Sequence, residues 1–305
     1  MKYIFVINPA AGKQGSEEDL LKVLSNVRGV SFEIYSTREA GDGTRFVRSY
    51  CKDHASEMNC FIAVGGDGTL NEVINGIINR ENAVFGCWPS GSGNDYVKYF
   101  GGAQYFLDIE KQLNGRIKMV DVMKMDSHYS VNVINFGFES AVAETMNKVR
   151  RKAVIGGKNA YTTGIVKSLF TSRHNKGEIK VDGRVINPDG TYMLCTCANG
   201  SYVGGAYNCA PSSIVDDGLL EVCEVKPVSI AKLASLIKVY RNGEHLNDPR
   251  FSEILTYARG KTVEITSEKE MSICYDGEIT YGTHFVIQCL PKKIGFLVPE
   301  GAKLD

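Results

Sequence analysis

Three glycine-rich segments carry side chains that could bind an anion or transfer a proton. The first is Gly65-Gly66-Asp67-Gly68-Thr69-Leu70-Asn71-Glu72, which follows an apolar run and opens a segment with helical spacing. Glycines at a strand-to-helix turn let the backbone approach a polyphosphate, and the free N–H groups of the helix start face the anion. Gly-Asp-Gly alone is also an ordinary turn. The preceding strand, and a capping box formed by Thr69 and Glu72, favour a phosphate-binding loop.

Two further segments of similar composition also follow apolar runs. Asn8-Pro9-Ala10-Ala11-Gly12 comes after one run, and Pro89-Ser90-Gly91-Ser92-Gly93-Asn94-Asp95 comes after another. Loops that leave the carboxyl ends of parallel strands converge on one edge of the sheet, where ligands bind. Together the three loops predict a nucleotide site. The sequence contains no P-loop motif. Gly41-Asp42-Gly43 begins a GxGxxG pattern, but position 46, which would have to be the third glycine, is Phe46.

Two acidic turns lie in the second half of the chain. Asp216-Asp217-Gly218 and Asp276-Gly277-Glu278 both contain Asp-Gly, which is a strong hairpin signal. From the residues alone, the first is equally a turn or a metal site, and the second favours a turn. The five histidines lie in unrelated segments, and the nine cysteines include no CxxC pair, which argues against a zinc or histidine metal site.

The elements that must position these loops change character along the chain. The first part alternates short strands and helices, which predicts a parallel α/β sheet. Its expected strands are Tyr3–Ile7, Phe32–Ile34, Phe61–Val64 and Val84–Trp88, and its expected helices begin near Ser16, Phe46 and Leu70. After about residue 116, strands meet at tight turns, which predicts an antiparallel sandwich or barrel. The expected strands there are Met119–Met125, Tyr129–Phe136, Ile179–Val181, Val185–Ile186, Thr262–Thr266, Ser272–Tyr275 and His284–Leu290, with helices at Glu139–Lys152, Tyr161–Phe170 and Ser229–Asn242.

The bulk composition limits the classes of partner. The 305 residues are 43% hydrophobic, and 35 basic residues balance 35 acidic ones, so no net field attracts nucleic acid or an anionic membrane. Any contact with a membrane surface must be local and transient. The apolar start of the chain is too short for a secretory signal, and no run is long enough to span a membrane. The sequence therefore predicts a cytoplasmic protein with reduced thiols, at most peripheral at the membrane.

Five motifs occur in an order that resembles a known family. They are Asn8-Pro9-x-x-Gly12, Gly65-Gly66-Asp67-Gly68-Thr69, Pro89-x-Gly91-Ser92-Gly93-Asn94-Asp95, Ala210-Pro211 with Asp216-Asp217-Gly218-Leu219-Leu220, and Asp276-Gly277-Glu278. The chain resembles the diacylglycerol kinase catalytic domain, in particular bacterial lipid kinases of the diacylglycerol and sphingosine kinase type. The resemblance implies an N-terminal three-layer α/β nucleotide-binding domain (1–122) and a C-terminal antiparallel β-sandwich (123–290) for the lipid. It also implies that the tail (291–305) returns to the first domain.

The resemblance also assigns roles to residues. It implies that ATP contacts Asn8, Pro9, Ala10, Ala11, Gly12, Thr37, Gly66, Asp67, Gly68, Thr69, Leu70, Asn71, Glu72 and Ser92. It implies a structural Mg²⁺ on the Asp217 side chain and the backbone oxygens of Ile214 and Leu219. Glu278 would accept the proton of the lipid hydroxyl. Asp67, Asp95, Asp121 and Asp276 would support the metal and water network, although Asp121 equally fits a strand-edge position.

The expected activity is transfer of the γ-phosphate of ATP to the hydroxyl of a lipid such as diacylglycerol, in the cleft between the domains. One alternative is an NAD kinase, which shares the GGDG loop but continues differently from Pro89–Asp95. The other is a nucleotide-binding regulatory protein without catalysis, against which the three acids Asp67, Asp95 and Glu278 argue. The identity of the lipid stays open, as does assembly into a homodimer.

Overall fold

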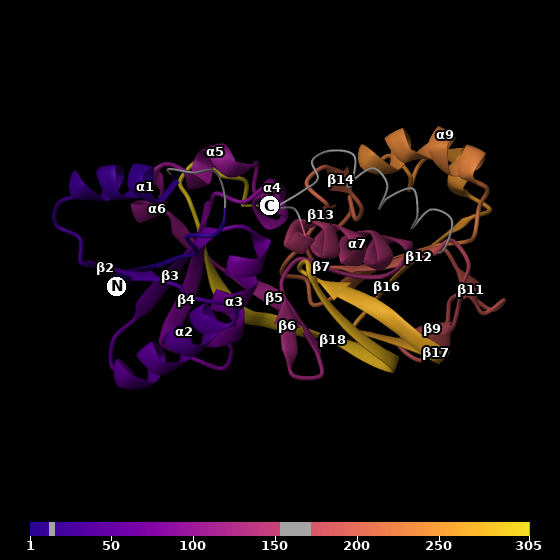
Figure 1. Ribbon diagram of the computed structural model, residues 1–305, viewed down its shortest axis with the longest axis horizontal. Helices are drawn as coiled ribbons and strands as arrows, with labels where there is room; N and C mark the ends of the chain where they lie inside the picture. Colours follow the sequence, from indigo (N-terminus) through magenta and orange to yellow (C-terminus); the bar gives the residue numbers. More distant parts are fainter. Residues whose placement is uncertain (12–15, 153–171, 305) are drawn as a thin grey trace.

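The structure is a computed structural model that describes residues 1–11, 16–152 and 172–304. Its N-terminal half is α/β and its C-terminal half is rich in antiparallel strands, and the two lie side by side (Figure 1). This is the fold class that the sequence predicts. The expected helix Tyr161–Phe170 lies outside the described residues.

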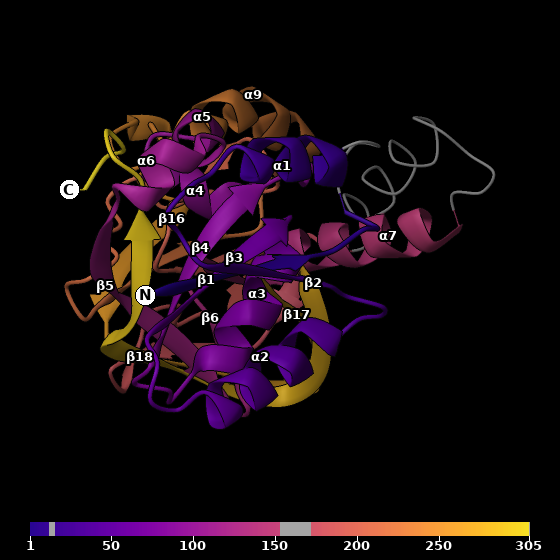
Figure 2. The same cartoon turned by 90° about the vertical axis from the view of Figure 1, so that its left-hand side faces the viewer.

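The N-terminal half is a three-layer arrangement around a parallel sheet. The strands are β1 (Lys2–Ile7), β2 (Phe32–Ser36), β3 (Asn59–Gly65) and β4 (Ala83–Pro89), in the order β4-β3-β1-β2. The helices are α1 (Ser16–Ser25), α2 (Asp42–Asp53), α3 (Asp67–Ile77), α4 (Asp95–Tyr99), α5 (Ala103–Phe106) and α6 (Ile109–Leu113). One face of the sheet is covered by α2 and α3 and the other by α1 and α6 (Figure 2). Because both faces are covered, β3 and β4 are buried along their whole length.

The C-terminal half is a β-sandwich with two helices on its outer face. Its main strands are β5 (Arg116–Met125), β6 (His128–Ser130), β7 (Val133–Gly137), β9 (Glu178–Val181), β10 (Arg184–Val185), β12 (Leu194–Ala198), β15 (Leu220–Val225), β16 (Leu255–Gly260), β17 (Thr262–Tyr275) and β18 (Glu278–Val298). Two short ribbons pair β8 (Asn175–Lys176) with β11 (Thr191–Tyr192), and β13 (Tyr202–Val203) with β14 (Tyr207–Asn208). The helices are α7 (Phe138–Lys152), α9 (Ile230–Arg241) and the short 3-10 helix Pro249–Phe251.

Alternation along the strands separates the two faces of this half. Cys195 and Cys197 of β12 lie in the sandwich core with Val222 of β15, whereas Leu194 and Ala198 pack beneath α9. Successive side chains of a strand point to opposite faces, so one set of residues faces the core and the other faces the helices. The second face is the one that borders the candidate site.

The strand β18 ties the two halves together. It begins as the partner of β17, continues beside β5, and ends parallel to β4, where Gly295 lies opposite Val84 and Phe296 opposite Phe85. The Phe296 ring packs against Phe85, with centroids 4.7 Å apart. In Figure 1 this strand runs in yellow from the right-hand half to the left. The end of the chain is therefore part of the first core, and the boundary expected near residue 122 falls inside β5.

Two details differ from the expected elements. The predicted strand Tyr129–Phe136 is broken into β6 and β7, because the Asn132 carbonyl accepts the N–H groups of Asn199 and Gly200 instead of continuing one ladder. The predicted strands Thr262–Thr266 and Ser272–Tyr275 are the two ends of β17, joined through an irregularity in its pairing with β18. Among the described residues, none of the helices is long and apolar enough to cross a membrane.

Candidate active site

The three glycine-rich loops lie together at the carboxyl edge of the parallel sheet. The Gly65 carbonyl accepts the N–H groups of Ser90 (2.9 Å) and Gly91 (3.2 Å), which joins the loops after β3 and β4. A Cβ atom added at Gly91 would lie 2.4 Å from the Gly66 Cα, so the two backbones touch. Only glycine permits this approach. The first turn of α3 therefore faces a surface made largely of backbone groups.

The loop after β1 is attached to the same turn. The Asn8 side chain donates from Nδ2 to Thr69 Oγ1 at 3.3 Å, and its Oδ1 accepts the Ala10 N–H at 3.0 Å. Pro9 and Ala10 are exposed at the mouth of the site. Gly12, expected to contact ATP, lies outside the described residues. Thr37 lies at the end of β2, and its N–H donates to the Ile7 carbonyl at 2.8 Å.

The expected capping box does not form. Helix α3 begins at Asp67 with Gly66 as its N-cap, so Thr69 lies inside the helix. The Glu72 carboxylate instead accepts the N–H groups of Gly41 and Gly43, both at 2.8 Å, at the start of α2. A carboxylate is favourable at a helix N-terminus, where it satisfies orphan amides. Glu72 therefore fixes α2 against α3 while still lining the cavity.

Two other residues of the expected nucleotide set point elsewhere. Leu70 lies in the core between α3 and the sheet. Asn71 donates from Nδ2 to the Tyr129 carbonyl at 2.9 Å and to Asp276 Oδ2 at 3.1 Å. These side chains hold the fold and the acids in place, and neither lines the cavity among the described residues.

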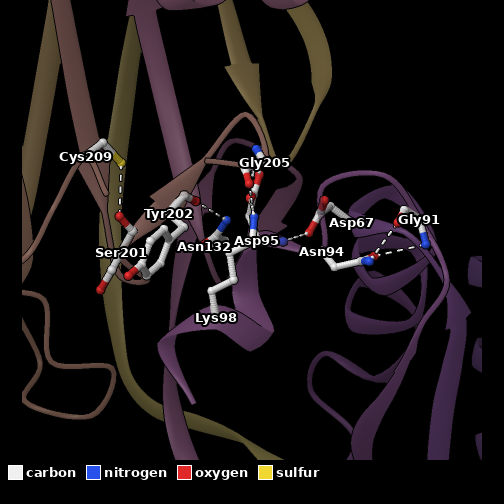
Figure 3. A network of polar contacts seen from close by, with 10 residues as sticks. All are labelled: Asp67, Gly91, Asn94, Asp95, Lys98, Asn132, Ser201, Tyr202, Gly205 and Cys209. Carbon is white, nitrogen blue, oxygen red and sulfur yellow. Dashed lines mark hydrogen bonds and ion pairs between the residues drawn. The ribbon is translucent and has the colours of Figure 1, made fainter. Parts of the chain in front are cut away.

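Asp67 is a half-buried carboxylate at the start of α3. Its Oδ1 accepts the Asp95 N–H at 2.7 Å (Figure 3). Burial, followed by the negative charge of Asp95, raises the pKa of Asp67 to about 6. A perturbed carboxyl group in a cleft is typical of a functional site. A nearby cation would stabilise the ionised form of Asp67, which its surroundings disfavour.

Asp95 is held by contacts from both halves of the molecule. Its Oδ1 pairs with Lys98 Nζ at 2.6 Å and accepts the Gly205 N–H at 3.0 Å. Lys98 also donates to the Gly205 carbonyl at 2.6 Å. Figure 3 shows this link between α4 and the β13–β14 ribbon. The Asp95 charge is thus already partnered, whereas the Asp67 contact is with a neutral amide.

The segment Asp276-Gly277-Glu278 is a hairpin turn that also places two acids in the site. Asp276 and Gly277 have positive φ angles of 46° and 92°, and Tyr275 pairs with Glu278 across the turn. Positive φ angles at both central residues are typical of a two-residue type I′ hairpin turn. Asp276 accepts from Asn71 and from the Val133 N–H (3.2 Å), and burial raises its pKa. The segment is therefore both a turn and a part of the site.

Glu278 is the exposed acid of the turn. Its Oε1 lies 3.9 Å from the position of a Cβ atom built on Gly68, in the first turn of α3. The carboxylate thus faces the same backbone surface as Asp67. Both residues line the cavity described next.

A single cavity of about 2140 Å³ joins the loops to the outer face of the sandwich. Its polar end is lined by the three loops and by Asp67, Asp95, Asp276 and Glu278. Its other end lies between α7 and α9 and is apolar, lined for example by Phe138, Val142, Leu233, Leu236 and Ile254. The arrangement suits a ligand that has a charged part and a long apolar part.

The residues predicted to bind a structural metal lie outside this cavity, in the segment just before β15. Asp217 Oδ1 accepts the Leu219 N–H at 3.0 Å, and its Oδ2 meets the Arg259 guanidinium. Ile214 is exposed. Asp121 is fully buried and accepts the N–H groups of Gly218 (2.6 Å) and Lys292 (2.7 Å), so it fastens two crossing segments. A cation at Asp217 would have to displace Arg259.

Sequence reasoning missed several residues of the site. Lys98 stands three residues after Asp95, a spacing that can place two side chains together on a helix. Glu139, Asn132 and Asn135 also line the cavity, and their sequence context offers no comparable signal. Gly205 lies far from Asp95 in the sequence, and only the fold brings it into the site.

Comparisons with known proteins agree with this architecture. Residues 2–125 match the diacylglycerol kinase catalytic domain, and residues 132–298 match the YegS C-terminal NAD kinase beta sandwich-like domain. A diacylglycerol kinase of Staphylococcus carnosus (strain TM300) is 31% identical over 283 residues, covering 90% of this chain and 87% of that protein. The chain belongs to the diacylglycerol kinase family.

Other relatives of the family cover the chain to a similar extent. A diacylglycerol kinase of Bacillus subtilis (strain 168) is 27% identical over 280 residues, covering 90% of this chain and 88% of that protein. A Yersinia enterocolitica protein named "Probable lipid kinase YegS-like" is 28% identical over 301 residues, covering 96% of each. A crystal structure from Bacillus anthracis strain Sterne superposes with a TM-score of 0.74 at 25% identity, covering 99% of this chain and 98% of that one. Membership of the family makes the chain a kinase of the lipid-kinase type.

Proposed function

We propose that the chain transfers the γ-phosphate of ATP to the hydroxyl of a lipid. The observation that carries the proposal is the continuous cavity with backbone amides and acids at one end and an apolar chamber at the other. A nucleotide triphosphate suits the first end and an acyl or alkyl chain suits the second. An NAD kinase would have to fill the apolar chamber with a polar dinucleotide, which this lining disfavours.

The polar end contains groups that would hold the triphosphate. The first turn of α3 presents free N–H groups and the positive end of the helix dipole. The Gly66–Gly91 contact leaves no side chain between the phosphates and these amides. Ser92 and Asn8 line the same end. The adenosine would lie along the loops after β1 and β2, where Thr37 and Ala40 line the cavity.

Mg²⁺ fits this end as a partner of the phosphates. The described residues contain no group of three or more His, Cys, Asp or Glu side chains that could hold a metal alone. Mg²⁺ in kinases is instead bound by one or two carboxylates together with substrate phosphates and water. Asp67 has the chemistry for this, because its carboxylate lines the cavity, is partnered only by a neutral amide and has a raised pKa. The cation would neutralise charge on the transferred group.

We assign the role of the base to Glu278, whose carboxylate faces the first turn of α3. In the reaction, the lipid oxygen forms a bond to the γ-phosphorus while the bond from that phosphorus to the bridging oxygen of ADP breaks. The hydroxyl proton passes to the Glu278 carboxylate. Asp276 does not suit this role as well, since both of its oxygens accept hydrogen bonds from the protein. Asp276 instead holds the turn so that Glu278 faces the first turn of α3.

The test is transfer of label from γ-labelled ATP, with Mg²⁺, into a total lipid extract, followed by mass spectrometry of the product. Parallel reactions contain NAD or no acceptor. Label in a lipid phosphate supports the proposal. Label in NADP instead supports an NAD kinase, and nucleotide binding without any transfer or hydrolysis supports a regulatory protein.

A further inference from the structure

A row of polar groups lies between the acids and the apolar chamber. On the cavity-facing side of the sandwich, Asn135 of β7 lies directly opposite Thr196 of β12 and Cys274 of β17. Opposed side chains on neighbouring strands are about 5 Å apart. Cys274 is the second-last residue of β17 and Asp276 follows the strand in the turn, so the row begins next to the acidic turn. One small lipid head group could contact both the polar row and the acidic turn.

Glu139 extends this row from the first turn of α7. Its Oε2 accepts from Thr196 Oγ1 at 2.9 Å, and its Oε1 accepts from Tyr240 OH at 2.8 Å. Both donors are neutral, and within the described part of the chain no lysine or arginine forms an ion pair with this carboxylate. Burial raises its pKa. A carboxylate offers about four acceptor positions, so two remain after these contacts.

Asn135 adds a second acceptor beside it. This residue is 2% exposed, and its Oδ1 has no hydrogen-bond partner among the described residues. A buried polar atom without a partner costs free energy, which a ligand that donates a hydrogen bond would recover. Asn132 also lines the cavity, and its Oδ1 likewise has no hydrogen-bond partner among the described residues. The row is thus rich in acceptors that a bound molecule can satisfy.

We propose that Glu139 and Asn135 form a head-group subsite that selects lipid alcohols with a second hydrogen-bond donor next to the phosphorylated hydroxyl. This inference rests on the proposed function. The second donor is a hydroxyl or an amino group, as in a monoacylglycerol or a long-chain amino alcohol. A diester of glycerol offers only carbonyl acceptors at the corresponding position, and these face acceptors in the protein. Glu139 acts as a specificity-determining residue and takes no part in proton transfer.

A matched set of single-chain alcohols tests the subsite on the wild-type protein. The set is 1,2-octadecanediol, 2-amino-1-octadecanol and 2-methoxy-1-octadecanol, which share one chain and one primary hydroxyl. The methoxy compound keeps the bulk and removes the donor. We expect kcat/KM to be at least about tenfold higher for the diol or the amino alcohol than for the methoxy alcohol, since a hydrogen bond to a charged acceptor is lost. The diol and amino arms show which donor is preferred.

Glu139→Gln and Glu224→Gln form a matched pair of variants. Glu224 of β15 is fully buried, whereas Glu139 is half-buried; Glu224 shares the face of Leu220 and Val222 in the sandwich core and does not line the cavity. Glu139→Gln should reduce the preference for the donor-bearing alcohols to within about threefold. Glu224→Gln should keep the wild-type preference. Melting temperatures of both variants separate loss of fold from loss of selection.

The outcomes are distinct. Equal kcat/KM for the methoxy alcohol and the diol in the wild type, or an unchanged preference in folded Glu139→Gln, would overturn the subsite. If Glu139→Gln does not fold, Asn135→Leu provides the second variant and should lower the same preference. Failure of the wild type to phosphorylate any alcohol, dioleoylglycerol included, would instead refute the proposed function, and the subsite with it.

Discussion

Asp67 Oδ1 lies 2.7 Å from the backbone nitrogen of Asp95, so two acids from separate loops lie side by side at the polar end of the cavity. The Asp95 charge is balanced by Lys98, whereas Asp67 is partnered by a neutral amide. The site therefore carries an excess of negative charge at the point where triphosphate and cation would meet. This asymmetry separates the roles of two acids that look equivalent in sequence.

Asp67→Asn should reduce kcat at least about 10²-fold, because the variant keeps the shape and the hydrogen bond to Asp95 but loses the charge that would hold Mg²⁺. Steady-state kinetics with saturating ATP measure this effect. Near-normal turnover would remove Asp67 from the mechanism.

The same variant should be more stable than the wild type at neutral pH. The folded-state pKa of Asp67 is raised to about 6, so ionising it costs stability. The cost is absent below the unfolded pKa near 4 and fully present above about 6. Urea unfolding should therefore show Asp67→Asn to be more stable by about 2 kcal/mol at pH 8 and nearly equal to the wild type at pH 4. A difference that does not depend on pH would contradict the assigned cause.

Lys98→Met should weaken both the fold and the reaction. It leaves Asp95 without its cation and removes the bond to the Gly205 carbonyl that joins the two halves. We expect a loss of about 1–3 kcal/mol in the free energy of unfolding, together with reduced kcat. Lys111→Met is the control, because its pair with Asp108 is exposed and should contribute less than about 0.5 kcal/mol. Equal effects of the two substitutions would show that the Lys98 link is not structural.

Arg259 and Mg²⁺ should compete for Asp217. If a structural metal binds there, it must displace the guanidinium, so Arg259→Ala should enlarge the rise in melting temperature that Mg²⁺ causes. Asp217→Ala should abolish that rise. Arg250→Ala serves as the control, since Arg250 pairs with Asp248 at another surface site. A Mg²⁺ effect that survives in Asp217→Ala would place the metal elsewhere.

Local patterns in the sequence account for the fold because they follow from short-range physics. The parallel strands and the helices around Val47 and Val73 show in the apolar spacing, and the Asp276-Gly277 turn shows in its residue types. The predicted capping box was wrong because Glu72 finds better donors in Gly41 and Gly43, about thirty residues earlier. Local spacing carries no information about that competition.

Only those parts of the site that form sequence motifs could be predicted. The glycine loops and the acids are visible in the sequence, but the division of labour between Asp67 and Asp95 depends on Gly205, which the fold brings from the other half. Asn135 faces the cavity because of strand alternation and the register of β7 with β12, and Glu139 reaches Thr196 of β12 from the first turn of α7. Register is a property of the assembled sheet, so these residues become visible only in the structure.

Glu278→Gln tests the central claim most directly. If Glu278 accepts the proton of the lipid hydroxyl, kcat should fall about 10²–10⁴-fold while the affinity for ATP and the melting temperature stay close to wild type. Asp276→Asn is the control, and it should cost stability because Asp276 holds Asn71 and the Val133 N–H. Folded Glu278→Gln that phosphorylates lipid at nearly the wild-type rate would contradict the assignment of the base, and with it the proposed route of the hydroxyl proton.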